Sequence, residues 1–111
     1  MENDIDIKIK MKSGSLLANA DLYIKTASFG YVTIKNFMIW HSNLYNKRLN
    51  DYANIVPPSY RSSAKYINLV FFEPVKEWEK LELLIWKAYL LKRDESVPID
   101  PYAVDKAFNT T

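Results

Sequence analysis

Residues 4–26 alternate between apolar and polar side chains with a period of two, and this pattern constrains the fold more than any other. On one face of residues 4–12 the side chains are all apolar: Ile5, Ile7, Ile9 and Met11. Such a pattern is typical of a strand with one buried face. Ser13-Gly14-Ser15 then gives a tight-turn signal, and residues 16–26 alternate in the same way. The sequence therefore predicts two strands joined as a hairpin.

A third strand is expected over residues 31–40, with a change of phase inside it. Val32 and Ile34 share one face, whereas Phe37 and Ile39 continue one residue out of step. One extra residue is what a β-bulge inserts into a strand. The sequence therefore predicts a bulge at Lys35-Asn36.

The middle of the chain is expected to contain two polar loops and a buried strand. Residues 41–53 and 59–65 are polar and predict exposed loops, separated by a short strand over residues 54–56 that Pro57-Pro58 ends. Residues 66–73 are apolar on both faces, which predicts a central strand that is covered on both sides. Phe71 is then expected to be buried.

Residues 76–93 repeat at helical spacing and carry two apolar stripes. The first stripe consists of Trp78, Leu81, Ile85, Ala88 and Tyr89. A helix on one face of a sheet needs one such stripe. The second stripe, formed by Leu83, Trp86 and Leu90, lies either under the C-terminal tail or in a subunit interface.

This order of elements predicts an α+β fold, an antiparallel sheet of four to five strands with one long C-terminal helix packed against it. The chain has 111 residues, which fits one domain. We expect that domain over residues 1–93 and a tail over residues 94–111, with a brief helical turn around Val104 and Phe108.

The residue types argue against catalysis and against bound cofactors. There is no cysteine and one histidine, His41, without a nucleophile or an orienting carboxylate beside it. Four glutamates, at positions 73, 77, 79 and 82, fall in the first turns of the expected helix, where the helix dipole favours negative charge. We therefore expect no enzyme activity, catalytic residue, metal, cofactor or small-molecule substrate.

The N-terminus and the hydropathy pattern indicate a soluble, cytoplasmic protein. The first ten residues are charged and alternating, unlike a secretory signal. The longest nearly apolar run, residues 83–91, is interrupted by Lys87 and is far too short to cross a bilayer. No membrane partner is expected.

Basic residues are the feature that bears on a binding partner. Lys plus Arg is 15 against 13 for Asp plus Glu, so the total charge is only weak support for a nucleic-acid partner. Four basic residues occupy the two expected loops among tyrosines: Lys47, Arg48, Arg61 and Lys65. Cations attract phosphates and tyrosines stack on unpaired bases. Lysines on outer strand faces are ordinary solvation, however, and composition alone favours that explanation.

Three passages resemble the SpoVG family of small bacterial septation and sporulation regulators. They are residues 18–22 leading into residues 30–39, the segment Val56-Pro57-Pro58-Ser59-Tyr60-Arg61, and residues 64–72 followed by the helix from Glu77 to Leu90. The resemblance implies a homodimer that binds DNA and RNA at selected sites. Ser59 and Arg61, and more loosely Lys65, match that family's basic loop. A longer loop over residues 43–53, two tryptophans in the helix and the tail after Arg93 depart from it.

Two functions from different classes follow. The first is a nucleic-acid-binding regulator, DNA or RNA, acting as a homodimer; its candidate surface is Lys47, Arg48, Ser59, Tyr60, Arg61 and Lys65. The second is a protein–protein interaction module that uses the second helix stripe and the tail. Convergence of the basic residues on one face favours the first, and exposure of Leu83 and Trp86 favours the second.

Overall fold

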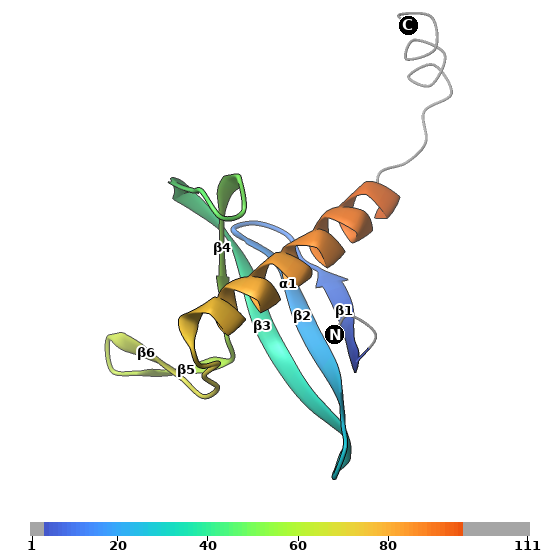
Figure 1. Ribbon diagram of the computed structural model, residues 1–111. Coiled ribbons are helices and arrows are strands. Elements are labelled where there is room, and N and C mark those ends of the chain that lie inside the picture. The colour runs from blue at the N-terminus through green and yellow to red at the C-terminus, as the bar shows by residue number, and fades with distance from the viewer. Residues whose placement is uncertain (1–3, 97–111) are drawn as a thin grey trace, which may run out of the picture.

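Four strands that follow one another along the chain form an antiparallel sheet in the order β1-β2-β3-β4, each paired with its neighbour in sequence (Figure 1). The computed structural model describes residues 4–96. The sheet strands are β1 Ile5–Met11, β2 Leu16–Thr26, β3 Gly30–Asn46 and β4 Asp51–Val56. A second sheet of two strands, β5 Ser59–Ser62 and β6 Lys65–Asn68, precedes the helix α1 Val75–Ser96. The expected α+β class is confirmed.

The alternation of the first 26 residues produces the expected hairpin. β1 pairs antiparallel with β2 from Ile5 opposite Ile24 to Met11 opposite Ala18. Ile9, Ala18 and Leu22 are buried on the face that α1 covers. One apolar face per strand is therefore enough to determine the register, because a slip of one residue would turn every side chain over.

The predicted bulge lies at Lys35-Asn36. Ala20 faces Phe37 and Leu22 faces Ile34, so two residues of β3 stand opposite the single residue Asp21. Asn36 has a φ of 71°, and its backbone N–H donates a hydrogen bond of 3.0 Å to Oδ1 of Asp21. The buried carboxylate thus provides a partner for the backbone group that the bulge frees from the ladder.

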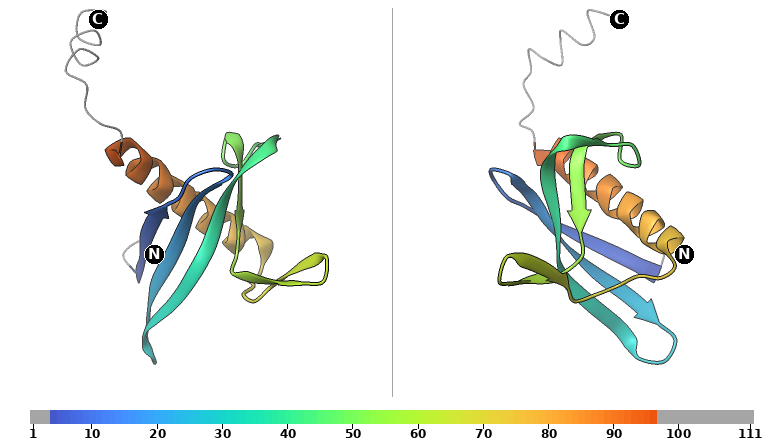
Figure 2. Two further views of the ribbon diagram at one scale, coloured as in Figure 1. Left: turned by 180° about the vertical axis from the view of Figure 1, so that it is seen from behind. Right: turned by 90° about the vertical axis from the view of Figure 1, so that its left-hand side faces the viewer.

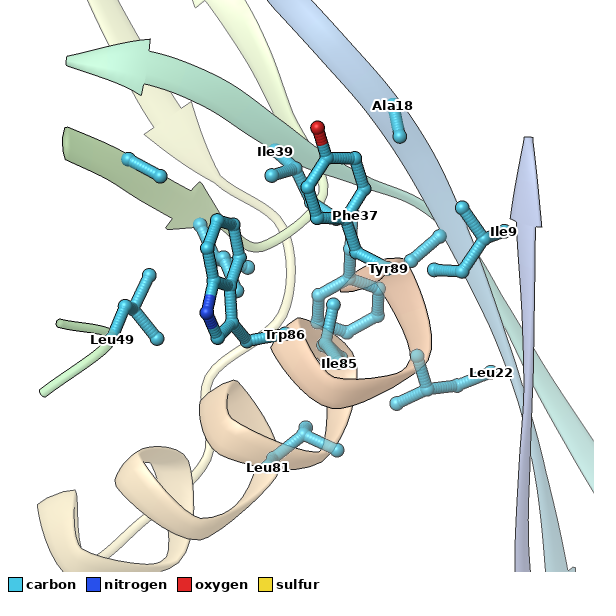
Figure 3. Close-up of a cluster of buried hydrophobic side chains, with 13 residues drawn as sticks. Ile9, Ala18, Leu22, Phe37, Ile39, Leu49, Leu81, Ile85, Trp86 and Tyr89 are labelled. Atoms are coloured by element: carbon cyan, nitrogen blue, oxygen red, sulfur yellow. The ribbon is translucent and has the colours of Figure 1, made fainter. Parts of the chain in front are cut away.

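The helix α1 lies diagonally across one face of the sheet and closes the core (Figures 1 and 2). The first stripe faces the sheet as predicted: Leu81, Ile85 and Tyr89 are buried against the strands (Figure 3). Phe37 is fully buried at the centre, with the rings of Phe72 and Trp78 6.1 and 6.3 Å away.

The expected exposed loop over residues 41–53 is wrong. β3 continues to Asn46, a short turn follows, and β4 begins at Asp51. The burial of Ala53 and Ile55 shows a period-two pattern in β4 that starts earlier than residue 54. The polar part of β3, residues 41–46, hides its strand character because it has no buried side chain and so lacks the alternation of a half-buried strand.

The expected central strand over residues 66–73 is also wrong, and so is the loop over residues 59–65. β5 and β6 pair with each other outside the main sheet, and the chain then runs irregularly to α1. Leu69 and Phe71 are 62% and 69% exposed, and from this apolar run Phe72 packs against the core. The physical reason is that the chain leaves the sheet at Pro57-Pro58, so that β4 stays an edge strand and no strand is added beyond it.

The helix extends beyond the predicted boundary at residue 93 and ends at Ser96. The tail after that point, including the turn expected around Val104 and Phe108, lies outside the described residues.

Candidate nucleic-acid interface

The β5–β6 hairpin, residues 59–68, projects from the body of the molecule and is called the arm below. In the right-hand view of Figure 2 the arm and α1 lie on opposite sides of the main sheet. Its turn is made by Ser63 and Ala64, and Ser63 has a φ of 56°. The body and the arm are joined through Pro57-Pro58 on one strand and residues 69–74 on the other.

Strand alternation sorts the candidate residues of the arm onto two faces. Tyr60 stands opposite Ile67 and Ser62 opposite Lys65, whereas Arg61 stands opposite Tyr66. Because neighbouring residues of a strand point to opposite faces, Arg61 and Tyr66 share one face and Tyr60, Lys65 and Ile67 share the other. Each face of the arm thus presents one basic residue and one tyrosine. The loop expected over residues 59–65 does not predict this division into two faces.

The side chains of the arm are available to a partner, with one exception. Tyr60, Arg61, Lys65 and Tyr66 are all exposed. Nε of Arg61 donates a 3.3 Å hydrogen bond to the carbonyl oxygen of Ser63, which leaves the outer end of the guanidinium available. Ser59 differs, because its hydroxyl oxygen is buried and finds no hydrogen-bond partner among residues 4–96. Ser59 therefore lies at the root of the arm rather than on its exposed surface.

Arg48 takes part in a structural ion pair. In the β3–β4 turn its Nε donates to Oε1 of Glu82 at 2.7 Å and its Nη2 donates to Oε2 at 3.2 Å. The Glu82 side chain is 1% exposed and that of Arg48 is 51% exposed. The hydrogen bond to Glu82 and then its charge raise the pKa of Arg48. This pair ties the turn to α1, so Arg48 is committed to the fold. Among the described residues, Lys47 is the cation of this turn without an ion pair.

The two basic groups do not form one surface. Lys47 and Arg48 lie at the end of the sheet where β4 begins, and the arm leaves the opposite end of β4 (Figure 1). β4 has six residues, and at a rise of about 3.3 Å per residue it separates the groups by roughly 20 Å. The four-residue surface expected from the sequence is therefore divided into a turn and an arm.

Lysines on the open face of the sheet form a third basic region, on the same side as the arm. Lys8 and Lys10 of β1 and Lys25 of β2 are exposed there. Nζ of Lys10 lies 3.4 Å from Oδ2 of the buried Asp21, which reduces its availability. The open face therefore supplies modest positive charge beside the arm rather than a site of its own.

The second helix stripe is divided between the core and the surface. Trp86 is buried and stacks on Tyr89 at 5.1 Å, and Leu90 is half-buried against the core. Leu83 is 41% exposed and lines a groove of about 480 Å³ between α1 and the strands β1 and β2, with Lys80 and Lys87 also in its wall. The expected interface of three residues is therefore reduced to one exposed leucine.

Within residues 4–96 no cluster of histidine and carboxylate side chains could hold a metal ion. The described region also contains no helix with the length and apolar character needed to cross a membrane. The fold and the arm define an α+β protein with a projecting aromatic and basic hairpin. In comparisons with known proteins, no family model, no curated protein and no solved structure matches the chain.

Proposed function

We propose that this protein binds nucleic acid, DNA or RNA, through its arm and that it does so as a homodimer without catalysing a reaction. The observation that carries the proposal is the pairing of a cation with a tyrosine on each exposed face of the arm, Arg61 with Tyr66 and Lys65 with Tyr60. The resemblance of residues 56–61 to the basic loop of the SpoVG family supports the same segment. A role in regulating septation or sporulation rests on that resemblance alone.

Electrostatics and stacking make this pairing suitable for a nucleic acid. Arg61 and Lys65 attract phosphates, and each neutralised phosphate releases condensed counterions. The slope of log affinity against log salt is then about −0.9 per contact on duplex DNA and about −0.7 on a single strand. Tyr60 and Tyr66 offer flat faces on which unpaired bases stack. We therefore expect binding that weakens steeply as salt is raised.

A salt titration with duplex DNA, single-stranded DNA and RNA tests the proposal. Arg61→Ala is expected to weaken binding to every sequence and to flatten the salt slope by about one unit per subunit. Lys47→Ala, at the far end of β4, is the matched control and should leave the slope nearly unchanged. Tyr66→Ala should weaken the binding of single-stranded nucleic acids more than the binding of duplex DNA. A folded Arg61→Ala, Lys65→Ala variant that binds like the parent would contradict the proposal.

A protein–protein interaction module is the second candidate, favoured by the groove beside Leu83. This groove has leucines and isoleucines in its wall, and Leu83 remains exposed at its side. If the parent protein binds none of the three nucleic acids at low salt, the interaction module replaces the first proposal. The part that the tail was expected to play in such a module concerns residues outside the described region.

A further inference from the structure

Among residues 4–96, one edge of β6 has no neighbour. In the described part of the chain β5 and β6 pair only with each other and form a separate sheet, so each has an open edge. A hairpin of two strands is marginal in water unless a third strand or a packed layer supports it. β1 and β4 are also edges, but they belong to a sheet that α1 already stabilises. The arm is therefore the sheet that most requires a partner strand, and the exposed apolar residues Ile67 and Leu69 lie on and just after β6.

The hydrogen-bond directions of β6 show which backbone groups are open. The N–H of Leu69 donates to the carbonyl of Pro58 at 2.7 Å, so residue 69 points toward the β5 side. In an antiparallel pair this direction alternates, so Ile67 and Lys65 also point toward β5. The N–H and C=O groups of Tyr66 and Asn68 consequently point toward the open edge, in the spacing that another strand needs.

Apolar side chains are exposed along the same strand and its extension. Tyr66 is 64% exposed, Ile67 is 41% exposed, and Leu69 and Phe71 are more than half exposed. A contiguous set of this kind marks an interaction surface. These residues belong to the run 66–73, whose apolar side chains on both faces predict a buried strand. Their composition is therefore typical of a strand that a neighbouring strand or layer covers.

We propose that β6 pairs antiparallel with β6 of a second copy of the chain, about a two-fold axis that passes beside Ile67. The result is one four-stranded sheet, β5-β6-β6-β5, shared by two copies. In this register Tyr66 of one copy faces Asn68 of the other, and these are the residues whose backbone groups point outward. Each such facing pair exchanges two hydrogen bonds. The inference rests on the homodimer of the proposed function and names its surface.

A second copy fits this edge better than another partner because the edge is complementary to itself. Pairing centred on Ile67 sets the two isoleucines side by side and places Lys65 opposite Leu69, so no two lysines face each other. The turn end of the arm projects from the sheet–helix body (Figures 1 and 2). The helix stripe is a weaker interface, since Trp86 is buried within its own copy.

The contact leaves the tyrosines of the arm available to a base. Side chains of a strand stand on the two faces of its sheet, so edge-to-edge pairing joins the two β6 backbones and leaves Tyr60 and Tyr66 on the faces of the four-stranded sheet. The dimer is therefore held by the paired backbone and by contacts of Ile67 and Leu69.

Two pairs of variants test this interface, with mass measured by light scattering over a range of concentrations. Asn68→Pro removes an outward N–H and should raise the dimer dissociation constant at least about 100-fold, whereas Asn68→Ala should leave it within about threefold. Ile67→Lys places two like charges beside the axis and should also give a monomer. Leu83→Lys is its control, because Leu83 and Ile67 are equally exposed, at 41%. Circular dichroism confirms that each variant keeps its helix.

A cysteine cross-link gives a readout that does not depend on loss of assembly. The chain has no cysteine, so Ile67→Cys introduces a single thiol per copy. The two residues at position 67 face each other without hydrogen bonds, where Cα atoms lie about 4.5 Å apart, within the range of a disulfide. Mild oxidation should convert most of the Ile67→Cys protein to a covalent dimer, and Leu83→Cys much less.

The outcomes separate the inference from the function on which it rests. A parent that is monomeric at high micromolar concentration overturns both the homodimer and this interface. A parent dimer that survives Asn68→Pro and Ile67→Lys but is broken by Leu83→Lys overturns the inference and leaves the homodimer in place. A dimer that dissociates as expected but binds no nucleic acid supports the interface and overturns the nucleic-acid proposal.

Discussion

The sheet–helix body and the arm both contain alternating apolar side chains, but the body covers them and the arm does not. In the body, β2 and β3 each have a strand on both sides and α1 above, so Leu22 and Phe37 are fully buried. In the arm two strands pair with no further layer over them among residues 4–96, so Ile67 and the adjoining Leu69 meet solvent. The comparison teaches that an apolar pattern predicts side chains that are stable when buried. It does not predict whether the same chain or a partner buries them.

Two phenylalanines offer the sharpest test of this difference. Phe37→Ala removes a fully buried ring at the centre of the core and should lower the free energy of unfolding by about 3–5 kcal/mol. Phe71→Ala removes a ring that is mostly exposed and should cost less than about 1 kcal/mol in dilute protein. Urea denaturation of both variants provides the measurement. Equal losses would show that the segment between the arm and α1 is packed as tightly as the body.

The ion pair between the β3–β4 turn and α1 predicts an asymmetric response. Arg48→Met leaves the carboxylate of Glu82 buried without a partner and should cost about 1.5–3 kcal/mol. Glu82→Leu lets the half-exposed arginine turn to water and should cost less than about 1 kcal/mol. Because the pKa of Arg48 is raised in the folded protein, the contribution of its charge is fully present below the ordinary pKa of arginine and is lost as pH rises through the raised pKa.

Thermal or urea unfolding at neutral pH measures both variants, and the double variant completes the cycle. If Glu82→Leu proves the more damaging change, the pair is not ordered as described. Neither variant should alter the salt slope of nucleic-acid binding, because Arg48 is assigned to the fold rather than to the arm.

Positive φ angles in the body and the arm give the smallest expected effects. Asn36→Val puts a β-branched residue at a φ of 71° in the bulge and should lower the stability of the whole protein by about 1–2 kcal/mol. Ser63→Val does the same at 56° in the arm. Its expected global cost is below about 0.5 kcal/mol, because the arm opens locally.

Hydrogen exchange distinguishes these two responses. Amides of β5 and β6 should exchange faster in the Ser63→Val variant while those of β2 and β3 keep their rates. Faster exchange throughout the sheet would mean that the arm and the body unfold as one unit.

Much of the body could be predicted from the sequence because the sheet and α1 bury the apolar faces that the sequence pattern indicates. The alternation of residues 4–26 predicts β1 and β2, the change of phase at Lys35-Asn36 predicts the bulge, and the helical spacing predicts α1. The polar end of β3 was missed because a strand exposed on both faces has no periodic signal. Its one clear trace was Ala53 and Ile55 on the facing strand.

The candidate site was less accessible to prediction because it depends on which residues share a face. The tyrosines and basic residues near positions 60–66 were identified, but their division into two faces required the hairpin register. The pairing of Arg48 with Glu82 joins residues 34 positions apart. Nothing in the sequence around either residue predicts this contact. The apolar run of residues 66–73 predicts a core strand, because strands with apolar side chains on both faces are usually buried within their own chain. The exposure of Tyr66, Ile67, Leu69 and Phe71 could not be predicted from this pattern.

The order of the strands in the main sheet also has a consequence for how the chain folds. Each of the strands β2, β3 and β4 pairs with its immediate predecessor, so each closure joins segments connected by a short turn. Loops of this length close at small entropic cost, and topologies with local pairing fold quickly. On the ribosome the sheet can assemble strand by strand as the chain emerges, and α1, made after the strands, seals an existing surface. During synthesis, the apolar face awaiting α1 is thus the part most dependent on timely completion of the chain.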